Sequence, residues 1–111
     1  MPPRLTSGIW VSAYLNRLRL ADIPAFVVRR GEDSAGAVVV KSSPLNGTAR
    51  ALQRSFDPMT GERLWIVLAE GPEPEVDAVL GRARSRDPDL WVIELEDRAG
   101  RTLLDEDGLR D

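Results

Sequence analysis

The sequence predicts an α+β fold, in which a mostly antiparallel sheet of four to five strands carries two helices packed on one face. Three observations predict this class. Apolar residues recur at helical spacing in two segments, and they alternate or run continuously in five short segments. Glycine, proline or asparagine separates most of these segments. The expected order is helix, four strands, helix and a last strand (α-β-β-β-β-α-β).

The first helix is expected to begin at Thr6 or Ser7, either of which can act as an N-cap, and to end before Pro24. Residues three and four positions apart share one face of a helix, which predicts a buried stripe. The stripe consists of Trp10, Tyr14, Leu18 and Ala21, flanked by Val11 and Leu15. Arg17 and Arg19 fall outside the stripe and are expected to be in solvent.

Four strands are expected next, at residues 25–30, 36–42, 48–56 and 63–69, and they are expected to form a meander. The second and fourth are apolar on both faces, which predicts an interior position for the second in particular. The pair Asn46-Gly47 predicts a hairpin turn, because both residues tolerate positive φ. The third strand has a mixed pattern, so it is expected at an edge or with one face in solvent.

The second helix is expected between residues 75 and 86, with acidic residues in its first turn and arginines near its end, as the helix dipole favours. A turn at Asp87-Pro88-Asp89 follows, and then the most regular strand of the chain. In this strand Trp91, Ile93 and Leu95 share one face and are expected to seal the core. The strand either pairs beside the first strand or inserts elsewhere in the sheet.

The chain has 111 residues and is expected to form one domain over residues 1–111. Its acidic end, from about residue 98 to residue 111, is expected to add a short strand or to lie loosely over the surface. The sequence contains neither cysteine nor histidine, which excludes disulfides, thiolate nucleophiles, Ser-His-Asp triads and imidazole-bound metals. No catalytic motif is present, so we expect a protein that is not an enzyme and has no cofactor.

No apolar run approaches the ~18–20 residues of a membrane span, and no signal-peptide pattern opens the chain. A cytoplasmic location without membrane contact is therefore expected. The net charge is −3, but the first thirty residues hold five arginines against one aspartate, whereas residues 87–111 hold nine acidic residues against three arginines. This asymmetry could attract the two ends of the chain to each other, within one molecule or across a dimer.

Five arginines in the first part of the chain are candidates for an anion or nucleic-acid site, because arginine contacts to phosphate dominate such binding. They are Arg4, Arg17, Arg19, Arg29 and Arg30, of which Arg17, Arg29 and Arg30 are the candidate binding residues. Against this site, the whole chain is acidic, with a pI near 5.0, and no aromatic signature of RNA binding interrupts the arginines.

Three aspartates lie in turns, namely Asp57, Asp87 and Asp89. If both turns lie at the same end of the sheet, these carboxylates could hold a hard cation such as Mg²⁺ and support hydrolysis. The alternative is that aspartate opens a turn by accepting a hydrogen bond from the backbone downstream, and this explanation is favoured, so no metal is expected. Lys41, the only lysine, is expected to point outward into solvent.

Several segments resemble one bacterial family. They are Arg4-Leu5-Thr6-Ser7, Trp10-Val11-Ser12-Ala13-Tyr14-Leu15, Arg29-Arg30-Gly31, Gly36-Ala37-Val38 and Asp87-Pro88-Asp89-Leu90-Trp91-Val92-Ile93-Glu94. The chain is similar in these segments to the uncharacterised family DUF1491, over most of its length. The resemblance implies a small stand-alone bacterial protein and brings no catalytic residues with it.

We therefore expect a non-enzymatic protein-interaction module that is homodimeric. Three tryptophans and a strand that is apolar on both faces exceed what a small one-sided sheet can cover, and exposed apolar surface marks an interface. The first alternative is an accessory protein that binds nucleic acid or another anion through its N-terminal arginines. The second alternative is a hydrolase that uses carboxylates and a metal ion.

Overall fold

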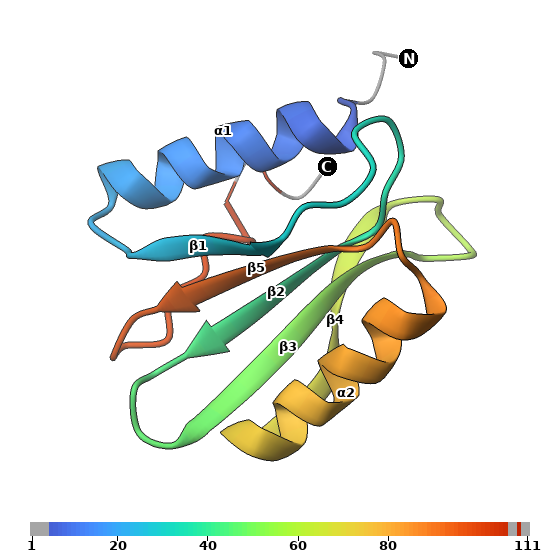
Figure 1. The fold of residues 1–111 in the computed structure, drawn as a ribbon. Helices are drawn as coiled ribbons and strands as arrows, with labels where there is room; N and C mark the ends of the chain where they lie inside the picture. Colours follow the sequence, from blue (N-terminus) through green and yellow to red (C-terminus); the bar gives the residue numbers. More distant parts are fainter. Residues whose placement is uncertain (1–4, 107–108, 110–111) are drawn as a thin grey trace.

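The computed structural model describes residues 5–106 and residue 109 (Figure 1). In this part of the chain there are two helices, α1 (Ser7–Leu20) and α2 (Glu73–Arg86). The strands are β1 (Ala25–Arg29), β2 (Val38–Ser43), β3 (Thr48–Phe56), β4 (Arg63–Pro72) and β5 (Trp91–Glu96). The predicted α+β class and order of elements are confirmed. Neither helix is long and apolar enough to cross a membrane.

The five strands form one sheet in the order β1-β5-β2-β3-β4. The pair β2–β5 is parallel and the other three pairs are antiparallel, so the sheet is mostly antiparallel, as predicted. The predicted four-strand meander is correct only for β2, β3 and β4, because β5 inserts between β1 and β2. A physical reason is that β5 carries apolar residues on both faces, and only an interior position covers both.

The two helices lie on opposite faces of the sheet, so the prediction of both helices on one face is wrong (Figure 1). Val38 and Val40 belong to the buried cluster that contains the α1 residues, whereas Val39 belongs to the cluster with Val76 and Leu80 of α2. Successive residues of a strand point to opposite faces. The four consecutive apolar residues 37–40 therefore need to be buried on both faces of the sheet. α1 buries one face and α2 buries the other.

The edges of the sheet also differ from the prediction. β3, expected at an edge or with one face in solvent, lies inside the sheet with Ala51 and Leu52 buried on its two faces, and Arg50 on the Leu52 face is exposed. β4 takes the edge although it is apolar on both faces, and Ile66 and Val67 are 44% and 51% exposed. The sequence pattern could not decide which of these two strands lies at the edge. The turn residues and the alternation of side chains are the same whether β3 or β4 is the outer strand of the hairpin.

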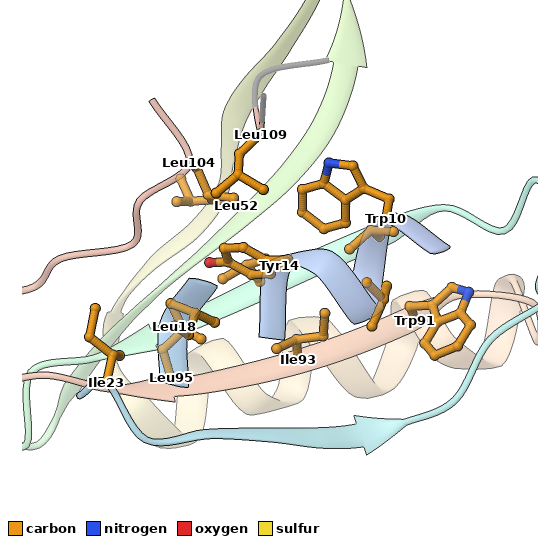
Figure 2. Close-up of a cluster of buried hydrophobic side chains, with 13 residues drawn as sticks. Trp10, Tyr14, Leu18, Ile23, Leu52, Trp91, Ile93, Leu95, Leu104 and Leu109 are labelled. Atoms are coloured by element: carbon orange, nitrogen blue, oxygen red, sulfur yellow. The ribbon is translucent and has the colours of Figure 1, made fainter. Parts of the chain in front are cut away.

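Figure 2 shows the larger core, where Trp10, Tyr14 and Leu18 of α1 meet Ile93 and Leu95 of β5. The predicted α1 stripe is thus confirmed, with these three α1 side chains buried. Leu104 and Leu109, which follow β5 in the acidic region, are also buried in this cluster.

The hydroxyl of Tyr14 donates a hydrogen bond of 2.8 Å to the carbonyl oxygen of Thr102, which ties α1 to the segment after β5. Burial raises the pKa of Tyr14 well above its usual value, because the phenolate would lose its hydration. A group whose pKa is raised on folding contributes stability that is complete below the unfolded pKa, about 10, and is lost above it.

We therefore expect the native protein to become less stable above about pH 10, with Tyr14 as one cause. Since Tyr14 is the only tyrosine, its ionisation can be followed by ultraviolet absorbance without interference. Tyrosinate should appear only as the protein unfolds, together with the loss of circular dichroism. Tyrosinate that forms while the circular dichroism stays native would contradict the buried environment.

Candidate functional site

The candidate arginines do not form one patch. Arg17 lies in the second half of α1, where it forms an ion pair of 3.8 Å with Glu106. Arg30 follows β1 and forms an ion pair of 3.1 Å with Asp33, whose backbone meets the first turn of α1. About ten residues of helix, roughly 15 Å, separate the two positions. Arg29 is half-buried in β1. Arg4 lies outside the described residues.

Two of the three turn aspartates, Asp57 and Asp87, bind the backbone of their own turns. Asp87 accepts a hydrogen bond of 3.1 Å from the backbone N–H of Asp89, and Asp57 accepts one of 2.8 Å from that of Met59. Both are the local bonds by which aspartate stabilises a turn. Among residues 5–106 and 109, no three acidic side chains are placed to hold a metal ion. This arrangement does not favour the hydrolase alternative.

Lys41 departs most clearly from expectation, because its side chain is only 8% exposed. It projects from β2 on the α2 face, where three carboxylates surround its ammonium group. The Nζ atom lies 2.8 Å from Asp77, 2.9 Å from Glu94 and 3.1 Å from Glu73. Two of these carboxylates come from the first half of α2 and one from β5. The ammonium group therefore joins the helix to the centre of the sheet.

The protonation of Lys41 decides its chemistry. Burial by itself lowers the pKa of the ammonium group, but hydrogen bonds to Asp77, Glu94 and Glu73 outweigh burial and raise the pKa above its usual value. A Schiff-base lysine must instead lose its proton near neutral pH. Lys41 is thus held as a cation and acts as a structural cross-link. Its position in the pattern Val38-Val39-Val40-Lys41, apolar on both faces, was the sequence signal for its burial.

A tightly built junction lies where the first turn of α1, the loop after β1 and the start of β5 meet. Trp91 donates an indole hydrogen bond of 2.8 Å to the carbonyl oxygen of Glu32, and Arg30 lies over its ring at 5.3 Å. A Cβ atom on Gly31 or Gly36 would overlap the carbonyl oxygen of Asp89, so the backbones approach too closely for any side chain there.

Hydrogen bonds within the loop after β1 also stabilise it. The carboxylate of Glu32 accepts hydrogen bonds of 2.7 and 2.9 Å from the backbone N–H groups of Ala35 and Ser34, which lower its pKa. The hydroxyl of Ser7 donates a bond of 2.7 Å to the carbonyl oxygen of Gly36. Residues from four of the five segments that resemble a known family thus meet at this junction, namely Ser7, Gly31, Gly36 and Trp91, although they are far apart in the sequence.

Beside the junction, a groove of about 620 Å³ runs between α1 and the edge strand β1. Ile9 and Val27 line it and are 57% and 42% exposed. On the other side of the same edge, Phe26 and Val28 are 50% and 47% exposed. We call these four side chains the β1 surface. Sequence reasoning missed it, because residues 25–30 indicate a strand but not which of its side chains stay exposed.

Comparison with known proteins bears on this architecture. The family DUF1491, described as "Protein of unknown function (DUF1491)", matches residues 5–105. No curated protein matches the chain. A crystal structure of a DUF1491 family protein from Caulobacter crescentus CB15 is 42% identical, covering 93% of this chain and 97% of that chain, with a TM-score of 0.85.

Two solution structures are also similar. An NMR structure of a DUF1491 family protein from Caulobacter crescentus CB15 is 41% identical over 95% of this chain and 96% of that chain, with a TM-score of 0.83. Protein Atu0922 from A. tumefaciens is 30% identical over 85% of this chain and 86% of that chain, with a TM-score of 0.71. The match of residues 5–105 and these structures agree, and the chain belongs to the DUF1491 family.

Proposed function

We propose that this protein is a non-enzymatic, homodimeric interaction module that recognises a partner polypeptide at the β1 surface. The observation that carries the proposal is the exposure of Phe26, Val27 and Val28 on an edge strand that lies beside an apolar groove. An exposed edge strand with apolar side chains readily accepts a further strand. A groove between such a strand and a helix gives side-chain pockets to the added segment.

The backbone of β1 is oriented for this role. The carbonyl oxygen of Pro24 accepts a bond of 3.0 Å from the N–H of Glu96. In an antiparallel pair, hydrogen-bonded residues alternate with residues whose N–H and C=O groups point away from the partner strand. Ala25 and Val27 therefore direct their polar backbone groups toward the open edge. An extended peptide can bond to these groups while its side chains enter the groove beside Ile9.

The partner is a protein that presents an extended apolar segment. Neither alternative expected from the sequence has comparable support. Arg17 and Arg30 lie apart and each forms an ion pair. The carboxylates of Asp57 and Asp87 accept hydrogen bonds from the backbone of their own turns. The proposal places the protein in the bacterial cytoplasm, in line with its relatives from Caulobacter crescentus and A. tumefaciens and with a fold that uses no disulfide.

The test is capture of partners from the native host with the wild-type chain and with two matched variants. Val27→Lys adds a charge at the β1 surface, whereas Leu45→Lys adds the same charge at a similarly exposed side chain (45%) in the turn between β2 and β3, away from both edge strands. We expect a specific partner to be retained by wild type and by Leu45→Lys, and its recovery to fall at least about tenfold with Val27→Lys. Equal recovery by all three folded proteins would overturn the proposal.

A further inference from the structure

We infer that two copies of this chain assemble by pairing their β4 strands antiparallel about a two-fold axis, which joins two five-stranded sheets into one. This inference rests on the homodimeric part of the proposed function and names its surface. β4 forms the edge opposite β1 (Figure 1), so the β1 surface stays open in such a dimer. The occupant of the β4 edge is thus a second copy, and the partner polypeptide takes the other edge.

The first observation is the composition of β4. The strand has ten residues, and the six from Leu64 to Ala69 are all uncharged and apolar. Edge strands normally carry a charge or a proline in their middle, which prevents pairing with another chain. Ile66 and Val67 are instead 44% and 51% exposed at the centre of the strand. Trp65 is held in place by Trp10, with the ring centroids 5.5 Å apart.

The second observation is the direction of the backbone groups. The N–H of Asp57 donates a bond of 2.8 Å to the carbonyl oxygen of Glu62, which sets the alternation along β3 and β4. Trp65 and Val67 then point their N–H and C=O groups away from β3. A two-fold axis at Ile66 places Trp65 of one copy opposite Val67 of the other. These two pairs exchange about four backbone hydrogen bonds.

The third observation is the charge at the two ends of β4. Val67 pairs with Leu52 and Ala69 pairs with Ala51, so Leu68 is an extra residue that forms a β-bulge. Because the bulge takes up one residue, Arg63 and Glu70 both lie three pairing steps from Ile66. Both are also on the α1 face, since each lines a pocket there together with Arg50.

The two-fold axis therefore brings Arg63 of each copy opposite Glu70 of the other. An interface with two-fold symmetry must be complementary to itself. Opposite charges at equal distances from the axis satisfy this requirement, because the symmetry then forms two identical pairs of Arg63 with Glu70. The same two-fold rotation packs the exposed side chain of Val67 against the ring of Trp65 in the other copy. Charge, backbone direction and apolar surface thus select the same register.

β1 is less suited to self-association. It has five residues, and a bulge at Val28 interrupts its pairing with β5. Only Ala25 and Val27 remain with outward backbone groups before that bulge. This short edge, flanked by a groove, is suited to one added peptide rather than to a second folded domain, whose helix α1 would have to share the space beside Ile9.

The test is the molar mass in solution, measured by light scattering after size exclusion over a range of concentrations. We expect the wild type to be a dimer and Ile66→Lys, which places a charge on the axis, to be a monomer. Val27→Lys is the matched control at the other edge and should stay dimeric. Circular dichroism checks that each variant is folded, and the exposure of Ile66 favours this outcome.

A second set of variants tests the register itself. Arg63→Glu and Glu70→Arg each place like charges opposite one another twice, and each should raise the dimer Kd by about tenfold or more. The double variant restores opposite charges and should recover most of the affinity. A dimer unaffected by these changes, or dissociated by Val27→Lys, would overturn the β4 assignment while homodimerisation stands. A wild-type monomer at every concentration would overturn both.

Discussion

Replacing Trp91 with alanine is expected to lower the free energy of unfolding by about 3–5 kcal/mol, the range for truncation of a buried aromatic side chain. Trp91 is 2% exposed and packs in the core beneath α1. It also donates the indole bond to Glu32 that fixes the loop after β1. The substitution removes apolar contacts, leaves a cavity and leaves the carbonyl oxygen of Glu32 without its indole donor. Chemical denaturation followed by circular dichroism measures the change.

Two control variants separate these contributions. Trp91→Phe keeps most of the apolar volume but loses the indole N–H, and we expect a cost of about 1 kcal/mol for the hydrogen bond with a smaller packing loss. Asp89→Ala, two residues earlier, should be within about 0.5 kcal/mol of wild type, since the carbonyl oxygen of Asp89, which accepts from Glu32, survives the change. A larger effect for Asp89→Ala than for Trp91→Ala would mean that this turn is a functional site rather than a structural one.

Lys41→Met is expected to cost about 3 kcal/mol, the lower end of the range for breaking a buried ion pair by removing one partner. The thioether fills much of the volume of the lysine side chain but leaves Glu73, Asp77 and Glu94 facing each other without a cation. The lower end applies because these carboxylates are partly exposed and water can screen them. Asp77→Asn should cost less than about 1 kcal/mol, since two carboxylates still hold the ammonium group.

The cost of Lys41→Met should depend on pH. In the wild type the pKa of Lys41 is raised on folding, so its contribution is complete below about pH 10.4 and is lost above that value.

The contribution of Tyr14 to stability is lost in the same alkaline range and must be removed to isolate that of Lys41. In a Tyr14→Phe background, the remaining loss of stability above about pH 10 should disappear when Lys41→Met is added. A double variant with an unchanged alkaline loss would show that the ammonium group is not held by its three carboxylates.

Periodicity was sufficient for the parts of the fold that depend on local spacing. The stripe through Trp10, Tyr14 and Leu18 was readable because one helix face repeats every three to four residues wherever the helix packs. The turn at Asp87-Pro88-Asp89 was readable because its hydrogen bonds lie within the turn. The interior position of β2 followed from its apolar residues on both faces.

The layers and the sites were not readable in this way. Alternation along a strand shows which residues share a face, but it does not show which helix covers that face or which strand lies alongside. For this reason the helices were expected on one face, the meander was expected to include β1, and β3 was expected at an edge or with one face in solvent. The candidate arginines were neighbours only by their position in the first part of the chain.

The sequence by itself determined the class of fold, the order of its elements, the α1 stripe and the exclusion of histidine and cysteine chemistry, because these depend on residue type and local period. The tertiary structure alone decided that β5 separates β1 from β2, that three carboxylates from two elements surround Lys41, and that two apolar edges stay open. Each of these depends on pairing between residues distant in the chain, and the free energy of that pairing is not encoded in any single segment.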